Sequence, residues 1–209
     1  MKRVACFIDG LNLHHSLRVN YHKWLDLSLL ARRLISSRSE SISAIHYFFS
    51  HAEWRPKSYG RDREYVVALE AIGVDVVLGH FKEKSLYCTA CGIHSLGHEE
   101  KETDVNIALY MLNGAYKNSY DKAILITRDS DLAPVLKMIR SEFPKLEIEI
   151  VAPPSYYGHS NDLVRLATSK KKIRIRQIEA CLLPRQVINP QTGAIAATRP
   201  TAYDPPQSP

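Results

Sequence analysis

The chain has 209 residues and a formal net charge of +6, from 28 Lys and Arg against 22 Asp and Glu. Hydrophobic residues make up 45% of it and charged residues 24%, and these proportions exclude a wholly disordered or fibrous protein. The length favours one domain with a small insert, and the excess positive charge permits a nucleic-acid partner without proving one.

Short apolar runs alternate with helical patterns through most of the chain. Strands are predicted at residues 4–8, 42–49, 74–78, 123–126, 148–151 and 173–175. Helices are predicted at residues 25–35, 61–72, 105–116 and 132–139. Continuous apolar strands separated by helices are typical of a parallel sheet that is covered on both faces. We therefore expect an α/β fold, a three-layer Rossmann-like domain over residues 1–183.

The segment at about residues 79–100 breaks this alternation and is expected to be an inserted hairpin. It contains Cys88 and Cys91 in a C-x-x-C-G turn, with His94 and His98 shortly after it. Such a turn allows two thiolates to point at one ion, and a Cys₂His₂ zinc site would stabilise an insert too small for its own core. Common zinc-finger spacings are wider, so His80 or a more distant residue could replace one ligand.

The alternative for this insert is a pair of free thiols in a hairpin with exposed histidines. A redox pair is less favoured, because the two cysteines do not open a helix after a strand.

The proline-rich segment 184–209 holds six of the eleven prolines and few large apolar groups. We expect it to be a flexible tail or a docking peptide for a protein partner.

Several features bear on location. No apolar run approaches the ~18 residues needed to cross a bilayer, so no membrane partner is expected. Met1-Lys2-Arg3 leads directly into a short apolar run and Asp9, without the features of a signal peptide. We therefore expect a cytoplasmic protein, and its four cysteines fit a reducing compartment.

Acidic residues follow the predicted strands directly. Asp9 follows the first strand, Asp129 and Asp131 follow the strand at 123–126, and Asp104 begins a helix. Function in open α/β sheets collects at the carboxyl ends of strands, where converging carboxylates repel one another unless a cation neutralises them. Oxygen ligands suit Mg²⁺ or Mn²⁺, so we predict metal-dependent phosphoryl chemistry. Each acid taken alone fits a helix cap at least as well, but a lone charge at Asp9 beside an apolar strand would be costly.

Motifs of competing α/β chemistries are missing from the sequence. It contains no G-x-x-x-x-G-K-[ST], no G-x-S-x-G, and no G-x-G-x-x-G after the first strand. Leu11 stands where a phosphatase with an aspartyl nucleophile would have its second Asp.

Three sequence blocks resemble the NYN domain family, which belongs to the PIN-like ribonuclease superfold. The blocks are FIDGLN at 7–12, EKETDV at 100–105, and DSD at 129–131 followed by Leu132 and Pro134. The resemblance covers about residues 3 to 180. It implies a parallel sheet with an acid cluster that binds Mg²⁺ or Mn²⁺ and hydrolyses phosphodiester bonds of RNA, with RNA as the partner.

The resemblance also implies roles for single residues. Asp9, Asp104, Asp129 and Asp131 would be the catalytic and metal-binding acids, and Asn12 and Ser130 would support the substrate. Arg128 departs from the family, which commonly has a small residue there; it either contacts phosphate or crowds the site. Lys101 could neutralise charge on the transferring phosphate or be a solvated surface lysine.

Two basic groups complete the sequence. Residues 170–176 hold five basic residues in seven, and the alternation at 173–176 predicts a half-buried strand with arginines on one face. That face would either meet phosphates or protect a sheet edge. The second group lies among Trp54 and Tyr59 and consists of Arg55, Lys57, Arg61 and Arg63. These arginines and aromatic rings could stack single-stranded bases, or the segment could be a solvated loop and helix start.

Two hypotheses of function follow. The first is an endoribonuclease that uses the four aspartates. The second is a catalytically idle module of the same fold that binds RNA or protein. The intact acid set favours the first and Arg128 favours the second, while self-association stays open.

Overall fold

The computed structural model describes residues 1–154 and 158–206. Its centre is a sheet of six strands in the order β3-β2-β1-β6-β7-β8. Each neighbouring pair in this sheet is parallel. The strands are β1 (Lys2–Asp9), β2 (Glu40–Phe49), β3 (Asp75–Leu78), β6 (Lys122–Ile126), β7 (Glu147–Ala152) and β8 (Ser169–Lys172). The predicted α/β fold with a parallel sheet is therefore confirmed.

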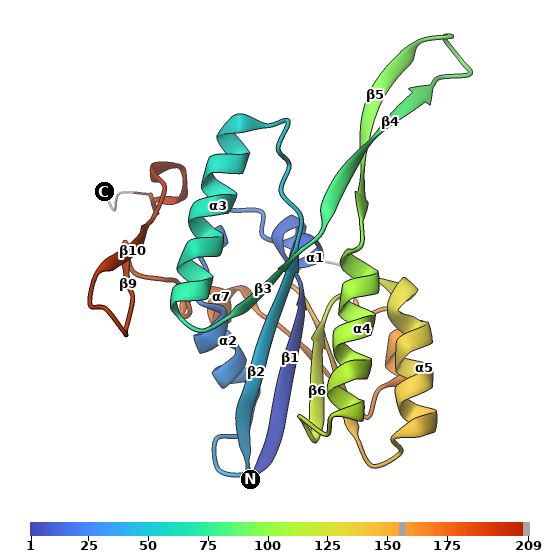
Figure 1. The fold of residues 1–209 in the computed structure, drawn as a ribbon, viewed down its shortest axis with the longest axis vertical. Helices are drawn as coiled ribbons and strands as arrows, with labels where there is room; N and C mark the ends of the chain where they lie inside the picture. Colours follow the sequence, from blue (N-terminus) through green and yellow to red (C-terminus); the bar gives the residue numbers. More distant parts are fainter. Residues whose placement is uncertain (155–157, 207–209) are drawn as a thin grey trace.

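Helices cover both faces of the sheet. They are α1 (Gly10–Ser16), α2 (Leu27–Leu34), α3 (Pro56–Ala71), α4 (Thr103–Tyr116), α5 (Ala133–Glu142), α6 (Asn161–Leu166) and α7 (Ile175–Glu179). One core contains side chains of α1, α2, α3 and α7, and the other contains those of α4, α5 and α6. Figure 1 shows α4 and α5 on one side of the strands and α2 and α3 on the other. Because β1 is buried on both faces, its sequence is a continuous apolar run.

The order of the strands reverses beside β1. The chain passes from β1 outward to β2 and β3, and then returns to place β6 on the other side of β1. In open α/β sheets, ligands bind at the carboxyl ends of the strands at such a reversal. β1 ends at Asp9 and β6 ends three residues before Asp129, so the topology brings these two acids to one edge.

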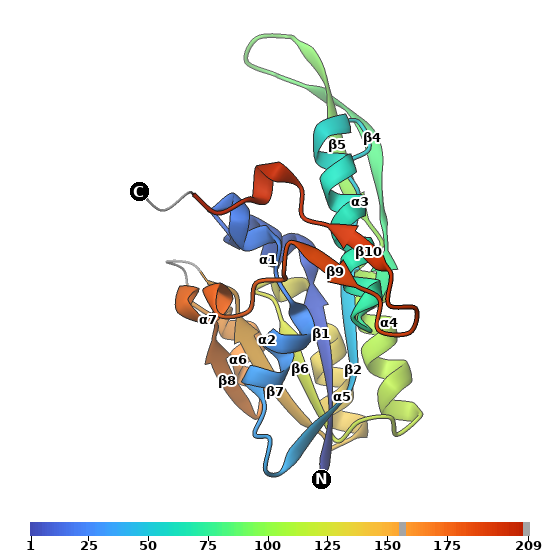
Figure 2. The ribbon, with the colours of Figure 1, turned by 90° about the vertical axis from the view of Figure 1, so that its left-hand side faces the viewer.

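The insert is a two-stranded antiparallel hairpin of β4 (His80–Tyr87) and β5 (His94–Lys101). Figures 1 and 2 show it extending well beyond the body of the domain. At its base the Trp54 ring stacks on His98, with centroids 3.6 Å apart, and meets Phe81 edge-on at 4.8 Å. The predicted inserted hairpin is therefore present, and its aromatic base joins it to the domain.

The expectation of a flexible tail is wrong for residues 186–204. This segment forms β9 (Gln186–Ile188), β10 (Ile195–Thr198) and the 3-10 helix η3 (Thr201–Tyr203). We call it the C-terminal ribbon, and Figure 1 shows it beside α3. Val187, Ala197 and Tyr203 are each at most 4% exposed. Few apolar residues suffice here because the C-terminal ribbon packs onto an existing core and does not form one of its own. The composition of the segment does not reveal such a contact. The domain boundary at 183 stays a prediction.

The predicted strand at 173–175 is also wrong. β8 ends at Lys172 and Ile175 begins α7. Ile173 is fully buried whereas Ile175 is 44% exposed, so the two isoleucines do not share the buried face of one strand. The Arg174 N–H donates to Gln177 Oε1 at 2.9 Å, as at a helix start. The predicted row of arginines on a strand face is therefore absent from this segment.

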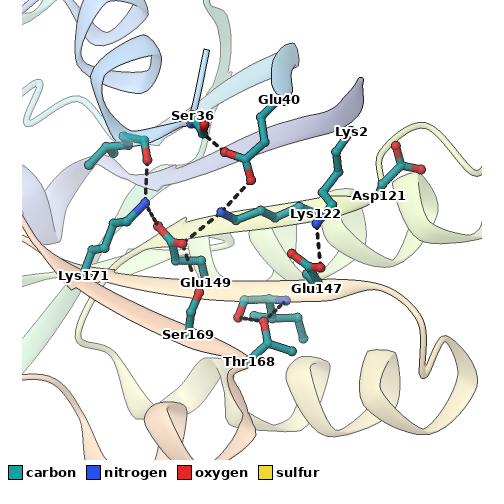
Figure 3. Close-up of polar contacts among 12 residues, drawn as sticks. Lys2, Ser36, Glu40, Asp121, Lys122, Glu147, Glu149, Thr168, Ser169 and Lys171 are labelled. Atoms are coloured by element: carbon teal, nitrogen blue, oxygen red, sulfur yellow. Dashed lines mark hydrogen bonds and ion pairs between the residues drawn. The ribbon is translucent and has the colours of Figure 1, made fainter. Parts of the chain in front are cut away.

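A network of charged side chains joins four strands of the sheet (Figure 3). Lys122 Nζ lies 3.1 Å from Glu40 Oε1 and 2.9 Å from Glu149 Oε2, and Lys171 Nζ lies 3.0 Å from Glu149 Oε1. The side chains of Lys122 and Glu149 are only 7% and 3% exposed. These charges tie β2, β6, β7 and β8 together, so removing one would leave the others uncompensated.

Within the described ranges, the structure has no helix that is both long and apolar enough to span a membrane.

Candidate active site

Asp9 is held rigidly at the junction of β1 and α1. Its Oδ1 accepts a hydrogen bond from the Asn12 N–H at 2.9 Å, and its Oδ2 accepts one from the Thr127 hydroxyl at 2.7 Å. The residue is 5% exposed. This burial, with a smaller contribution from the charges of Asp129 and Glu100, raises the pKa of Asp9 to about 6 despite both hydrogen bonds.

Gly10 allows the tight passage from strand to helix beside Asp9. A Cβ atom at this position would lie 2.5 Å from the Phe48 carbonyl oxygen and 2.7 Å from the Tyr47 ring. Both distances are too short for real atoms, so only glycine fits without a shift of β2. The packing of β1 against β2 thereby fixes where the Asp9 carboxylate stands.

Thr127 connects Asp9 with Asp129. Its side chain is fully buried; its hydroxyl donates to Asp9 and accepts from the Asp129 N–H at 3.0 Å. Asp129 in turn accepts from the Asp131 N–H at 3.0 Å, which caps the 3-10 helix η2 (Ser130–Leu132). Asp129 is therefore a helix cap and a member of the acid cluster at once.

Asp104 approaches from the first turn of α4, just after Glu102, which has a left-handed backbone with φ of 77°. In the described part of the chain, its carboxylate accepts no hydrogen bond. Burial raises the pKa of Asp104 to about 6, and the charges of Asp129, Asp9, Glu100 and Asp131 add to this effect in that order. Asp104 thus experiences the repulsion that the sequence predicted for converging acids.

These acids line a cavity of about 200 Å³, which we call the acid pocket. Its lining residues are Asp9, Leu11, Asn12, His15, Glu100, Thr103, Asp104 and Asp129. Three of the four predicted acids and the predicted Asn12 therefore share one cavity. Asp131 and Ser130 are exposed in η2 and do not line it, although the Asp131 charge still reaches Asp104.

Glu100 was not predicted as a site residue, and for His15 the position shortly after Asn12 left a substrate contact and a partly buried helix histidine as alternatives. Glu100 accepts hydrogen bonds from the Ser50 hydroxyl at 3.0 Å and the Thr103 N–H at 3.2 Å, and from the Thr103 hydroxyl. The end of the inserted hairpin delivers it to the pocket, four residues before Asp104. Glu100 stands shortly before a helix whose first turn carries Asp104. This spacing of two acids is the sequence signal that could have identified Glu100.

Lys101 and Arg128 have other partners than the acid pocket. Lys101 Nζ pairs with Glu99 Oε1 at 2.9 Å on the hairpin. The Arg128 guanidinium donates to the Pro153 carbonyl oxygen, and burial lowers the pKa of Arg128. Arg128 therefore does not line the acid pocket, and the concern that it crowds the site does not apply to this conformation.

The acid pocket fits a hard cation in the kind of donor it offers. Asn12 Oδ1 is buried without a hydrogen-bond partner, and the carboxylates around it supply oxygen ligands. Over residues 1–154 and 158–206, however, no three His, Cys, Asp or Glu side chains are drawn close enough together to hold an ion. The donors line one cavity without converging on a point.

The predicted Cys₂His₂ set is not assembled. His94 lies opposite Tyr87 and His98 opposite Glu83 in the hairpin, so the two histidines are four residues apart on one strand, about 13 Å. The His98 ring stacks on Trp54 at the base, far along the hairpin from the cysteines at the tip. His80, the suggested substitute, pairs with Glu102 at 3.3 Å. The reason is the rise of an extended strand, about 3.3 Å per residue, which the spacing argument did not include.

The two aromatic residues of the second basic group each have a partner within the protein. The Arg63 guanidinium lies 5.6 Å from the Tyr59 ring centroid, and Trp54 stacks on His98. A basic hollow of about 560 Å³ lies elsewhere, between the end of α2 and α7. It is lined by Arg33, Leu34, Ile35, Ser36, Lys171, Lys172, Arg174, Arg176 and Gln177.

Comparison with known proteins gives three findings. The model of the NYN domain family matches residues 3–170. The 6-hydroxy-3-succinoylpyridine 3-monooxygenase HspA of Pseudomonas putida is 26% identical over 223 aligned positions, covering 88% of this chain and 71% of that protein. A crystal structure of a protein of unknown function from Vibrio parahaemolyticus has a TM-score of 0.56 at 19% identity, covering 87% of this chain and 96% of that one. This last likeness shows the fold alone.

Proposed function

The chain belongs to the NYN domain family of the PIN-like nuclease superfamily, and from this premise we propose that it is a metal-dependent ribonuclease. Family membership supports a nuclease acting on nucleic acid; the proposal adds RNA as the substrate and the acid pocket as the site of phosphodiester hydrolysis.

One observation carries the proposal: carboxylates crowd together where the strand order reverses. The ionised forms of Asp9 and Asp104 are disfavoured by burial and by neighbouring acids, which raise both pKa values to about 6. A protein under selection for stability alone would not gather buried like charges. A cation bound among these carboxylates would remove their repulsion. A cation of this kind can also polarise a bound phosphodiester.

Mg²⁺ or Mn²⁺ held by Asp9, Asp104, Asp129 and Glu100 would polarise the phosphate and lower the pKa of a bound water. The protein's own part is to hold and orient. Through its single hydroxyl, Thr127 donates to the Asp9 carboxylate and accepts from the backbone N–H of Asp129, and so ties the two residues together. Asn12 Oδ1, without a partner of its own, is free to accept from a water. Exposed His15 lines the same cavity and is proposed to contact a phosphate oxygen of the substrate.

Substrate contacts beyond the pocket follow from charge. Ser130, exposed directly beside Asp129, is proposed to contact the substrate. The basic hollow at Arg33, Arg174 and Arg176 offers guanidinium groups to an RNA backbone. Because phosphate contacts of this kind release counterions, RNA affinity should fall with salt and weaken uniformly across sequences when one arginine is replaced.

The test measures metal binding and RNA cleavage on the same samples. Mn²⁺ is titrated into the wild type and into Asp129→Asn, and each mixture is then given labelled structured and unstructured RNA. The proposal expects Asp129→Asn to lose both Mn²⁺ binding and cleavage. Asp162→Asn, an exposed aspartate at the start of α6, is the matched control and should keep both.

The second candidate is the idle module that binds RNA or protein, and one observation favours it: the acids line a cavity without converging to ligand distance. RNA binding that is unaffected by Mn²⁺ and never followed by cleavage would establish it. The Pseudomonas relative is named as a monooxygenase, and at 26% identity that activity is not transferred to this chain.

A further inference from the structure

The tip of the β4–β5 hairpin brings two thiols together. The Cys88 N–H donates to the Ile93 carbonyl oxygen at 2.9 Å, and the Gly92 N–H donates to the Cys88 carbonyl oxygen at 2.8 Å. Gly92 has a φ of 69°, which lets the chain reverse directly after Cys91. Cys88 and Cys91 are both exposed at this turn, and their side chains interact with each other. This turn therefore presents a pair of adjacent thiols to solvent.

One chain supplies only these two ligands. Over the described ranges, no third His, Cys, Asp or Glu joins the two cysteines, and residues 155–157 and 207–209 contain none of these types. Figures 1 and 2 show that the tip lies far from the body of the domain, so no ligand from that body can reach it. His94, which faces Tyr87 beside the tip, does not form a set of three with the cysteines in the described residues. Structural zinc sites take four ligands in a tetrahedron, so a site at this tip is incomplete without a second molecule.

Apolar side chains surround the thiols in open solvent. Leu86 is 46% exposed, Tyr87 59% and Ile93 62%, and all three flank the turn. Side chains of this kind at the end of a projecting hairpin are typical of a contact surface. A small patch alone buries too little area for a stable complex, but it would pack around a metal bridge.

We propose that two copies of this chain join at their hairpin tips through one zinc ion, bound by Cys88 and Cys91 of each copy. A twofold axis through the ion makes the two pairs equivalent, and it brings Leu86, Tyr87 and Ile93 of both copies together around it. The four thiols release four protons to solvent, and the resulting tetrathiolate site has a net charge of −2.

This inference is independent of the proposed nuclease activity. The acid pocket lies at the base of the hairpin and at the carboxyl ends of β1 and β6, so a contact between tips leaves both pockets open. The zinc bridge would set two such pockets at opposite ends of one elongated dimer. A long RNA could then meet two sites on one particle.

The test combines native mass spectrometry with zinc analysis on the full chain, purified without added zinc and kept under a reductant. The expected result is a dimer with one zinc per two chains, which a chelator converts to metal-free monomers. Cys88→Ser and Cys91→Ser should each be monomeric and zinc-free. Thr89→Ala, in the same turn, is the matched control and should keep both zinc and dimer.

Three results would overturn the proposal: a wild type without zinc, a monomer with one zinc per chain, or a dimer that survives chelation under the reductant. Circular dichroism of each serine variant checks that the fold is intact, which is expected because both cysteines are exposed at the tip. If the variants cleave RNA like the wild type, loss of the bridge is separated from loss of the nuclease site.

Discussion

Replacing Asp104 by asparagine should stabilise the metal-free protein near neutral pH. Burial and the charges of Asp129, Asp9, Glu100 and Asp131 raise the pKa of Asp104 from 3.8 to about 6. In the described part of the structure its carboxylate accepts no hydrogen bond, so the substitution removes a charge and little else. The same acid that the proposed activity requires is therefore expected to weaken the fold.

The magnitude follows from the shift in pKa. A change of about two pKa units corresponds to roughly 3 kcal/mol, and because Asp104 is partly exposed, solvent screening reduces this to about 1–2 kcal/mol. Between about pH 4 and pH 6 the folded state retains a proton that the unfolded chain has released. The wild type therefore loses stability as pH rises through that window, and the penalty is complete above it.

Urea denaturation of the chelator-treated proteins measures this effect. Asp104→Asn should have the larger free energy of unfolding near neutral pH and no advantage at about pH 4, where the wild-type carboxyl is protonated. Saturating Mn²⁺ should reverse the order, because a ligand stabilises only the protein that binds it. A variant less stable than the wild type near neutral pH, or an equal gain at both pH values, would refute the electrostatic reasoning.

Three further predictions concern the scaffold. Lys122→Met should lower the free energy of unfolding by about 3 kcal/mol in urea denaturation, because it removes the buried partner of Glu149 and leaves that carboxylate only the half-exposed Lys171. Tyr203→Ala should cost about 3 kcal/mol in the same assay if the C-terminal ribbon is part of the core, and no loss would mean that the ribbon is dispensable. Gly10→Ala should cost about 1–3 kcal/mol and also weaken Mn²⁺ binding, measured by calorimetry, since its Cβ would displace the β1–α1 junction that holds Asp9.

Local patterns were enough to predict the sheet and most of the acid pocket. Asp9 and Asp129 each follow a continuous apolar strand, and the carboxyl ends of neighbouring parallel strands share one edge. Those two facts are visible in the sequence, and their consequence holds in the structure. Asp104 was identifiable because it lies one residue into a helix with a clear apolar face.

Features that depend on distant contacts were not predictable in the same way. Glu100 enters the pocket only because Ser50 and Thr103 hold it, and Ser50 lies 50 residues away in sequence. The C-terminal ribbon has too few apolar residues to form a core of its own, and the sequence did not show that it packs on α3 instead. The histidines of the hairpin looked like zinc ligands until the extended strand placed His98 about 13 Å further from the tip than His94.

The most direct test of the central claim is the cleavage rate of labelled RNA with Mn²⁺, for the wild type and for Asp129→Asn. If the acid pocket is a metal-dependent active site, the wild type cleaves with Mn²⁺ and not with chelator, and the substitution lowers the rate by roughly 100-fold or more. Asp162→Asn should cleave like the wild type. Equal cleavage by wild type and Asp129→Asn, or no cleavage by the wild type at any Mn²⁺ concentration, would contradict the assignment.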